Sequence, residues 1–503
     1  MILFGFLPQS SKTKAVAAVV SVTHARTVDS EDTPARRGDL ARFREEFYGA
    51  LTARADALFE LTDAVLCADG PVRSLAELTL VAEHRRGHGA MYDALGHGRV
   101  EPERIRRSLA ALPLPRMSDG RIVLAVDVSP WLRSDAPTSP ERLFCHVHGR
   151  GRGQAQMIPG WPYSFVAALE PGRTSWTALL DAVRLGPADD TTAATAGQLR
   201  AVITRLVAAG HWRPGDPRIL VVADAGYDIT RLAFVLADLP VELLGRIRSD
   251  RVLRGPRTLR AARATGRPPR HGPEFTLSAP DTWWAPTHTT RTDTSRYGHA
   301  VATSWDGLYP RLTHRGVWAD HPSELPIITG TLIRLQVERL PGDHAPKPIW
   351  LWSSTTGATA DDVTRWWQSF LRRFDLEHTF RLFKQTLGWT APKVRTPAAA
   401  DRWTWLIVTA HTQLRLARPS RSTSAAPGRD LPSPPGSLPR GSDAGFATSA
   451  RTPAAPRPHR NPPNPAPDGH PVPVTDTAPP ATTSANTPPA EQQATPTEVK
   501  DQA

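Results

Sequence analysis

The hydrophobic positions of the chain follow a helical spacing first and a strand spacing later. Between Asp39 and about Arg116, apolar residues recur at intervals of three, four and seven: Leu40, Phe43, Phe47, Leu51, Leu58 and Leu61. This spacing gathers them on one stripe of a helix that faces a core. We therefore predict a helical N-terminal DNA-binding domain over residues 39–116, preceded by a loose leader over residues 1–38.

From Arg121, short apolar runs replace the helical spacing. Strands are predicted over residues 122–128, 143–149, 164–170, 218–224 and 241–248. Helices are predicted around residues 175–185, 192–209 and 230–238. Three strands, a helical stretch, a strand, a helix and a strand form the element order of a ribonuclease-H-like α/β fold.

The predicted α/β core is interrupted and then resumes. Residues 117–249 make up its first part, and residues 250–356, with Arg-, Pro- and Thr-rich loops and scattered tryptophans, indicate a β-rich insertion. Helical periodicity returns over residues 357–418, which we predict to complete the core. Residues 419–503 are rich in Pro, Ala, Ser and Thr. They lack the apolar surface that folding needs, so we predict a disordered C-terminal tail.

The overall charge favours a polyanionic partner. The 503 residues carry a formal net charge of +12, and clustered Lys and Arg gain free energy by releasing counterions from phosphates. Nucleic acid is the first candidate, and the arginine bias of a GC-rich genome is the alternative explanation. A short helix beginning at Pro102 carries Arg104, Arg106 and Arg107, which either dock on DNA or form a solvated basic face.

Cysteine usage and hydropathy limit the cellular setting. The 2 cysteines, Cys67 and Cys145, lack the spacing of a zinc site, so neither a zinc site nor a disulfide framework is predicted. No apolar run approaches the roughly 20 residues that a membrane helix needs. We predict a cytoplasmic, nucleoid-associated protein with no membrane partner.

Two aspartates mark the ends of predicted strands. Asp127 lies near the end of the first strand and Asp224 at the end of the fourth. These strands are neighbours in a sheet of the predicted type, so their carboxylates converge, and such a pair favours a divalent cation. Taken singly, each aspartate also suits a turn or a helix cap. Asp228 suits the cap of the next helix better than the role of a substitute acid.

A third carboxylate lies between two cations on a predicted helix. Phe370, Arg373, Glu377 and Lys384 recur at spacings of three, four and seven, which places them within roughly a 60° arc of one helix. Glu377 is a candidate metal ligand, and Arg373 and Lys384 are candidates for binding phosphates. The alternative is a solvated face with weak ion pairs.

This helix resembles the signature Tyr-x2-Arg-x3-Glu-x6-Lys of the DDE insertion-sequence transposases. The chain has Phe370 in place of the tyrosine, which leaves a ring for stacking but no hydroxyl, and it matches the other three positions at full spacing. The branch with this signature carries a β-rich insertion between its second and third acids, as predicted here.

The two aspartates resemble the same family. Its first acid is followed by Ser or Thr at the second position, as Asp127 is by Ser129, and its second by x-Gly-aromatic, as Asp224 is by Gly226 and Tyr227. The resemblance extends over residues 39–418.

The resemblance implies a metal-dependent DNA endonuclease and strand transferase. Asp127, Asp224 and Glu377 would hold two Mg²⁺ or Mn²⁺ ions and catalyse cut-and-paste transposition. The implied partners are double-stranded DNA, namely the element's terminal inverted repeats and target DNA, and a second copy of the chain in a homodimeric synapse.

The resemblance also indicates further DNA contacts. An aromatic side chain of the insertion would stack on a flipped base, with Trp305 and Trp318 as the first candidates, although an ordinary core tryptophan is the commoner case. Arg246 and Arg248, at the end of the fifth strand, are candidates for binding backbone phosphates.

Two other functions remain open on the sequence alone. One is an inactive or domesticated DNA-binding relic that represses its element. The other is a nuclease of the same fold that acts on RNA/DNA hybrids or junctions, which explains neither the insertion nor the Arg-Glu-Lys helix.

Overall fold

The computed structural model describes residues 32–148, 155–257, 270–294, 297–319, 321–339 and 346–418. All of them belong to one compact unit, Met1–Ala425. Most of the predicted leader and the whole of the predicted tail lie outside the described residues.

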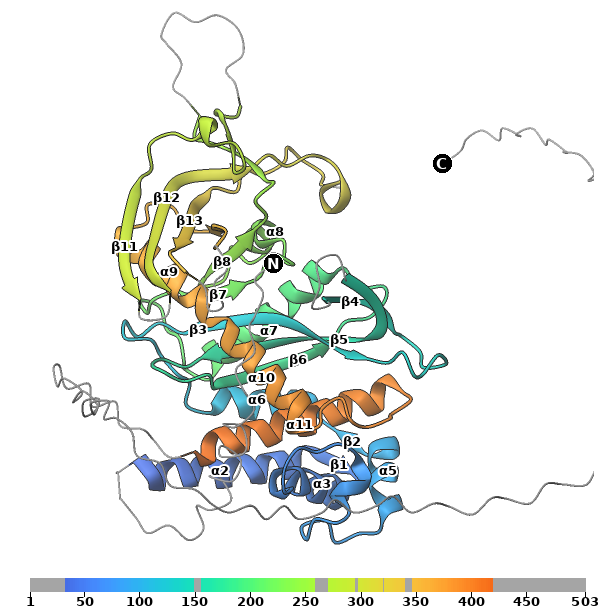
Figure 1. Ribbon diagram of the computed structural model, residues 1–503. Helices are drawn as coiled ribbons and strands as arrows, with labels where there is room; N and C mark the ends of the chain where they lie inside the picture. The colour runs from blue at the N-terminus through green and yellow to red at the C-terminus, as the bar shows by residue number, and fades with distance from the viewer. Residues whose placement is uncertain are drawn as a thin grey trace, which may run out of the picture. The chain divides into compact units, whose positions relative to one another are not determined.

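A large mixed β-sheet forms the centre of the molecule (Figure 1). Its first strands along the chain are β3 (Val123–Leu132), β4 (Leu143–His148), β5 (Ala155–Leu169), β6 (Thr177–Arg184), β7 (Ile219–Ala223) and β8 (Val241–Ile247). The strands β3, β7 and β8 are parallel to one another, whereas β5 is antiparallel to β3, β4 and β6. This mixed α/β arrangement is consistent with the predicted ribonuclease-H-like core.

One predicted element is wrong: residues 175–185 form strand β6 and not a helix. Its residues from Thr177 to Ala182 are all buried, because β6 lies in the sheet with helices on both sides. A short apolar run of this kind has no period that separates a strand from a buried helix. The third strand of the core order is therefore β6, and β4 is an additional strand that pairs with the start of the long β5.

Helices cover both faces of the sheet, and alternate strand residues point to each. On β3, Leu124 and Val126 pack in the cluster beneath α7 (Thr191–Ala208) and α8 (Ile229–Val235). Val123 and Ala125 pack on the opposite face, which is covered by three helices: α9 (Ala360–Arg372), α10 (Phe374–Gln385) and α11 (Pro397–Ala417). As predicted, Asp228 caps α8, because its carboxylate accepts a hydrogen bond from the Arg231 N–H.

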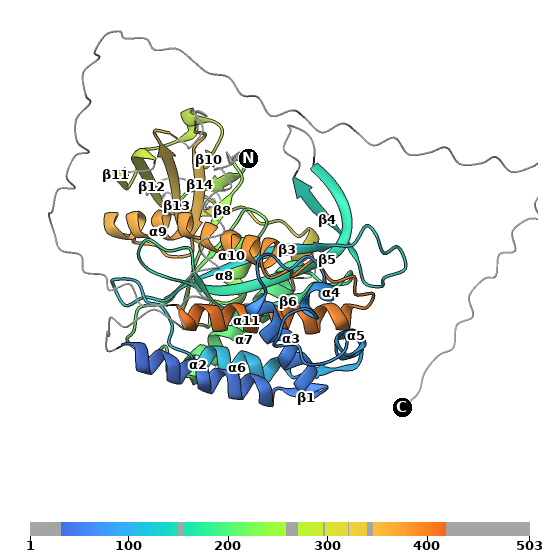
Figure 2. The ribbon, with the colours of Figure 1, turned by 60° about the horizontal axis from the view of Figure 1, so that its bottom comes forward.

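Three of the N-terminal helices pack against α11 (Figure 2). They are α2 (Asp32–Gly49), α3 (Ala55–Cys67) and α5 (His88–His97). Helix α4 (Leu75–Leu78) packs on α3, and α6 (Pro102–Ala111) packs on α2, α7 and β6. A small two-stranded sheet of β1 (Leu51–Ala53) and β2 (Arg99–Val100) completes the region. The first helix thus begins before the predicted start at Asp39. None of the helices in the described ranges is long and apolar enough to cross a membrane.

The basic face predicted on α6 is only partly exposed. Arg106 donates to the buried carboxylate of Asp181 at 2.6 Å, and Arg205 of α7 donates to the same group at 2.8 Å. Arg104 donates to the carbonyl oxygen of Gly49 at 2.5 Å. Arg107 is exposed and the Arg104 side chain is partly exposed, whereas Arg106 ties this helix to the core.

The stretch predicted as a β-rich insertion extends the same sheet. It contains β9 (Val252–Arg254), β10 (Glu274–Thr276), β11 (His288–Thr294), β12 (Gly298–Pro310), β13 (Gly330–Val337) and β14 (Ile349–Ser353), with short 3-10 turns at Pro280–Thr282 and Gly316–Trp318. Strand β14 pairs antiparallel with β8, with Trp352 opposite Gly245. The domain boundaries at 250 and 356 themselves stay predictions.

The predicted helix with the Arg-Glu-Lys spacing is interrupted at Arg373. Helix α9 begins with a capping box of Thr359 and Asp362 and ends at Arg372, and α10 begins at Phe374. Phe370 lies at the buried end of α9 and packs in the core. Its ring is therefore unavailable for stacking on DNA, because the core covers it.

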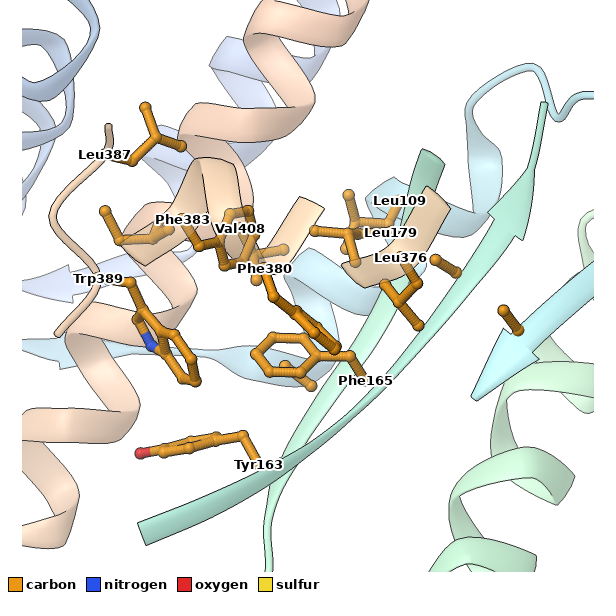
Figure 3. Close-up of a cluster of buried hydrophobic side chains, with 14 of the residues drawn as sticks. Leu109, Tyr163, Phe165, Leu179, Leu376, Phe380, Phe383, Leu387, Trp389 and Val408 are labelled. Atoms are coloured by element: carbon orange, nitrogen blue, oxygen red, sulfur yellow. The ribbon is translucent and has the colours of Figure 1, made fainter. Parts of the chain in front are cut away.

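An aromatic cluster fixes α10 on the sheet (Figure 3). The ring of Phe165 on β5 lies 5.2 Å from that of Phe380 and 5.9 Å from that of Phe383, measured between centroids. Trp389, just after α10, closes the cluster at 5.4 Å from Phe165. Aromatic pairs at these separations stabilise a core beyond the burial of the rings alone. The cluster therefore holds α10 in a fixed position over the sheet.

A buried histidine in α11 makes stability depend on pH. His411 lies between the rings of Trp176 and Phe383, and burial lowers the pKa of its imidazole to about 3. The unfolded chain binds a proton below about pH 6.5, whereas the folded chain does not. Between pH 8 and pH 5 this difference lowers the free energy of unfolding by about 2 kcal/mol.

We predict that His411→Gln removes this decrease in the free energy of unfolding between pH 8 and pH 5. Chemical denaturation at pH 8 and pH 5 should give a smaller decrease for the variant than for the unmodified chain, by about 2 kcal/mol. The exposed His314 supplies the control, since His314→Gln should keep the full decrease. Equal decreases in all three proteins would contradict the neutral state of His411.

We also predict that Phe370→Tyr destabilises the fold, although it restores the tyrosine of the signature. The added hydroxyl would be buried, which costs about 1–3 kcal/mol when no partner accepts its hydrogen bond. Thermal unfolding should show the decrease. Phe144, which is 69% exposed, is the control position, and Phe144→Tyr should leave the melting temperature unchanged.

Candidate active site

The strand register places the two predicted aspartates next to each other. In the parallel pair of β3 and β7, Val126 lies opposite Ala223, so Asp127 and Asp224 come next on each strand. Alternation puts both on the face covered by α9 to α11. Asp127 lies in the middle of β3 and not at its end, because β3 continues to Leu132 along β5 after β7 has stopped.

Glu377 meets the two aspartates through one guanidinium group. Arg373 places Nη1 at 2.5 Å from Oδ2 of Asp127, and Nη2 at 3.2 Å from Oε1 of Glu377 and at 3.5 Å from Oδ2 of Asp224. Its side chain is only 3% exposed. The structure thus brings the three predicted acids together, but around an arginine that the sequence had assigned to DNA phosphates.

Burial makes the carboxylates of Asp127 and Glu377 harder to ionise. It raises the pKa of Asp127 to about 6, against the opposing effect of Arg373, and Glu377 raises this pKa further. Burial also raises the pKa of Glu377, again partly opposed by Arg373. A further cation bound beside Asp127 and Glu377 would favour their ionised forms and lower both pKa values.

A second arginine lies beside Asp224. Arg246, on β8, places Nη1 at 3.9 Å from Oδ1 of Asp224, and alternation from the buried Leu244 puts both on the same face of the sheet. Arg248 lies apart from the acids and pairs with Asp250 at 2.5 Å on the surface. Of the two arginines predicted to bind phosphates, Arg246 therefore borders the acids.

Tyr227 is a member of the site that the sequence identified only as part of a motif. Its hydroxyl is buried. Burial first, and the carboxylate of Asp127 next, raise the pKa of Tyr227 well above its ordinary value, so the phenol stays neutral and can donate a hydrogen bond. The x-Gly-aromatic pattern after Asp224 was the available signal.

Lys384 does not reach the three acids. Its ammonium lies 5.6 Å from the ring centroid of Trp389, and burial lowers the pKa of Lys384 to about 8. In the described part of the chain no carboxylate pairs with it. Both residues lie on α10, and the seven positions between them place Lys384 about 10 Å further along the helix axis than Glu377.

The two tryptophans proposed for base stacking occupy different surroundings. Trp305 is buried, donates from Nε1 to the carbonyl oxygen of Trp284 at 2.8 Å, and packs on Phe275, so it belongs to the core of the extended sheet. Trp318 is at the limit of burial and packs against Phe234, which is 40% exposed. Neither ring presents a free face beside the acids.

The donor chemistry of the site fits a divalent cation. Asp127, Asp224 and Glu377 offer carboxylate oxygens, which Mg²⁺ and Mn²⁺ prefer, and the buried Oδ1 of Asp224 accepts no hydrogen bond within the described residues. Among those residues, no three His, Cys, Asp or Glu side chains are already arranged to hold a metal ion, and here the guanidinium of Arg373 lies between the acids. A cation would take over contacts that Arg373 now makes.

Comparison with known proteins agrees with this geometry. The family model described as DDE superfamily endonuclease matches residues 46–311, a range that includes Asp127, Asp224 and most of the strands that extend the sheet. No curated protein matches the chain. Two adjacent strand aspartates in such a sheet, joined to a third acid on α10, fit that match, and we conclude that the chain belongs to the DDE superfamily of endonucleases.

Proposed function

We propose that this endonuclease is the transposase of an insertion sequence, which cuts and rejoins the ends of its own element. The observation that carries the proposal is the convergence of Asp127, Asp224 and Glu377 on the guanidinium of Arg373. The matched spacing of Arg373, Glu377 and Lys384 supports the assignment to the insertion-sequence branch.

Each acid has a distinct structural support in this mechanism. Asp127 and Asp224 are fixed by the register of two parallel strands, and Glu377 is fixed by the packing of α10 on Phe165. These carboxylates would hold two Mg²⁺ or Mn²⁺ ions. When bound, such ions supply Lewis acidity, which activates a water or a 3′-hydroxyl and stabilises the leaving oxygen of a phosphodiester.

The remaining residues orient the DNA strand and limit water access. Arg246, half-exposed beside Asp224, is placed to bind a nonbridging phosphate oxygen. The buried rings under α10 exclude water from below the acids, which strengthens every charge interaction above them.

The partners follow from the reaction. The substrate is double-stranded DNA, first the terminal inverted repeats of the element and then target DNA. Two ends must be joined together, so we propose that two copies of the chain form the synapse. Inverted repeats flanking the gene would supply the natural substrate for a test.

The decisive experiment is cleavage of a labelled element end by the full chain. With Mg²⁺ or Mn²⁺ we expect nicking at the end of the repeat. Asp127→Asn, Asp224→Asn and Glu377→Gln should each lower the cleavage rate by more than about 100-fold, while DNA binding persists. The loss of a residue that only hydrogen-bonds to a metal ligand already costs about 10–100-fold.

Asp228→Asn is the matched control. Asparagine also caps helices, so this variant should keep both the fold and the cleavage rate. Sequence-specific binding without cleavage would favour the repressor relic instead. Cleavage that ignores the terminal sequence would favour a general nuclease of the same fold.

A further inference from the structure

Arg373 is out of reach of DNA in the described arrangement, because its side chain is only 3% exposed. Both of its Nη atoms lie against the carboxylates of Asp127, Asp224 and Glu377. Its Nε is buried without a hydrogen-bond partner among the described residues. A phosphate therefore reaches Arg373 only after the guanidinium has left the acids.

The acids and the guanidinium are mutually dependent in this state. Three carboxylates face one central cation, and a second cation, Arg246, lies 3.9 Å from Asp224. Like charges in a partly buried site repel strongly. The planar guanidinium offsets this repulsion with several donors at once, which a single ammonium does less well.

A divalent cation would bind the same three carboxylates. The atoms that contact Arg373 are Oδ2 of Asp127, Oδ2 of Asp224 and Oε1 of Glu377, one from each proposed metal ligand. Since each contact with the guanidinium occupies an acceptor on a ligand, metal and guanidinium compete for them.

We propose that Arg373 is the resident counter-ion of the acid cluster in the metal-free protein, that a divalent cation displaces it, and that the displaced guanidinium then binds a DNA phosphate. This inference rests on the proposed metal-dependent function and assigns Arg373 two successive partners. Metal loading and capture of the strand are then coupled, and the coupling is reciprocal.

The backbone around Arg373 suits such a change. The residue lies at the interruption between α9 and α10, so its side chain can reorient without opening a helix interior. The rings of Phe370 and Phe374 lie 5.8 and 5.0 Å from the guanidinium carbon. Both rings thus lie beside the guanidinium itself, and a displaced guanidinium would give up these cation–π contacts.

The test measures Mn²⁺ binding by the full chain without DNA, from the electron paramagnetic resonance signal of free Mn²⁺. Arg373→Ala removes the competitor, so we expect binding to tighten by about tenfold or more, in the range of a partly buried ion pair. Arg373→Gln, with a neutral side chain of similar length, should change affinity in the same direction. Arg200→Ala, which removes a remote exposed pair with Asp238, should leave it unchanged.

A small-molecule competition separates displacement from a structural effect. In Arg373→Ala, millimolar guanidinium should enter the vacated position and weaken Mn²⁺ binding again, whereas urea, which is neutral and of similar shape, should not. The unmodified chain should respond to neither. Unchanged or weaker Mn²⁺ binding in both Arg373 variants, or equal effects of guanidinium and urea, overturns the proposal.

Asp127→Asn distinguishes a failure of the counter-ion proposal from a failure of the proposed function. If Asp127→Asn abolishes Mn²⁺ binding while Arg373→Ala fails to tighten it, the metal site stands and only the counter-ion role is wrong. If Asp127→Asn leaves Mn²⁺ binding unchanged, the proposed metal site itself is wrong.

Discussion

The repulsion among three carboxylates on one face of a sheet is the constraint on which this site depends. At about 4 Å, two like charges near a protein surface repel by roughly 4 kcal/mol. Burial adds a further cost of ionisation, which raises the pKa of Asp127 and Glu377. The fold keeps the acids together because two strands fix the aspartates and an aromatic core fixes α10. Arg373 supplies the compensating charge.

The architecture around the acids is rigid where the chemistry needs precision. Asp127 lies on β3 and Asp224 directly follows β7, each one residue beyond the paired Val126 and Ala223, so the spacing of the two strands governs their separation. Glu377 lies on the outer side of a helix whose inner side carries Leu376, Phe380 and Phe383. A buried ion pair of Arg106 with Asp181 joins the N-terminal helices to the same core.

The sequence was sufficient for those features that local pattern decides. The apolar runs before Asp127 and Asp224 predicted both strands, and the spacing around Glu377 predicted a helix facing them. Strand β6 was missed because its residues are buried on both sides, which removes the alternation that identifies a half-exposed strand.

The roles of the cations were harder to predict, because they depend on tertiary contacts. Arg373 and Lys384 share a helical face by spacing, yet one lies among the acids and the other lies against Trp389. Trp305 is of a residue type that can stack on a base. Only its contacts with Phe275 and Trp284 show that its ring is enclosed. Phe370 likewise occupies a position of the signature, but the spacing of the signature does not show that its side chain is buried.

The pairing of β14 with β8 has a consequence for how this protein can change over evolution. The segment between the second and third acids supplies the neighbour that satisfies the backbone of β8, the strand that also carries Arg246. Loss of the segment would expose an open strand edge beside the acids, and exposed edges invite aggregation. The segment is thus a permanent part of the sheet, so relatives are expected to vary in its loops and to retain its strands.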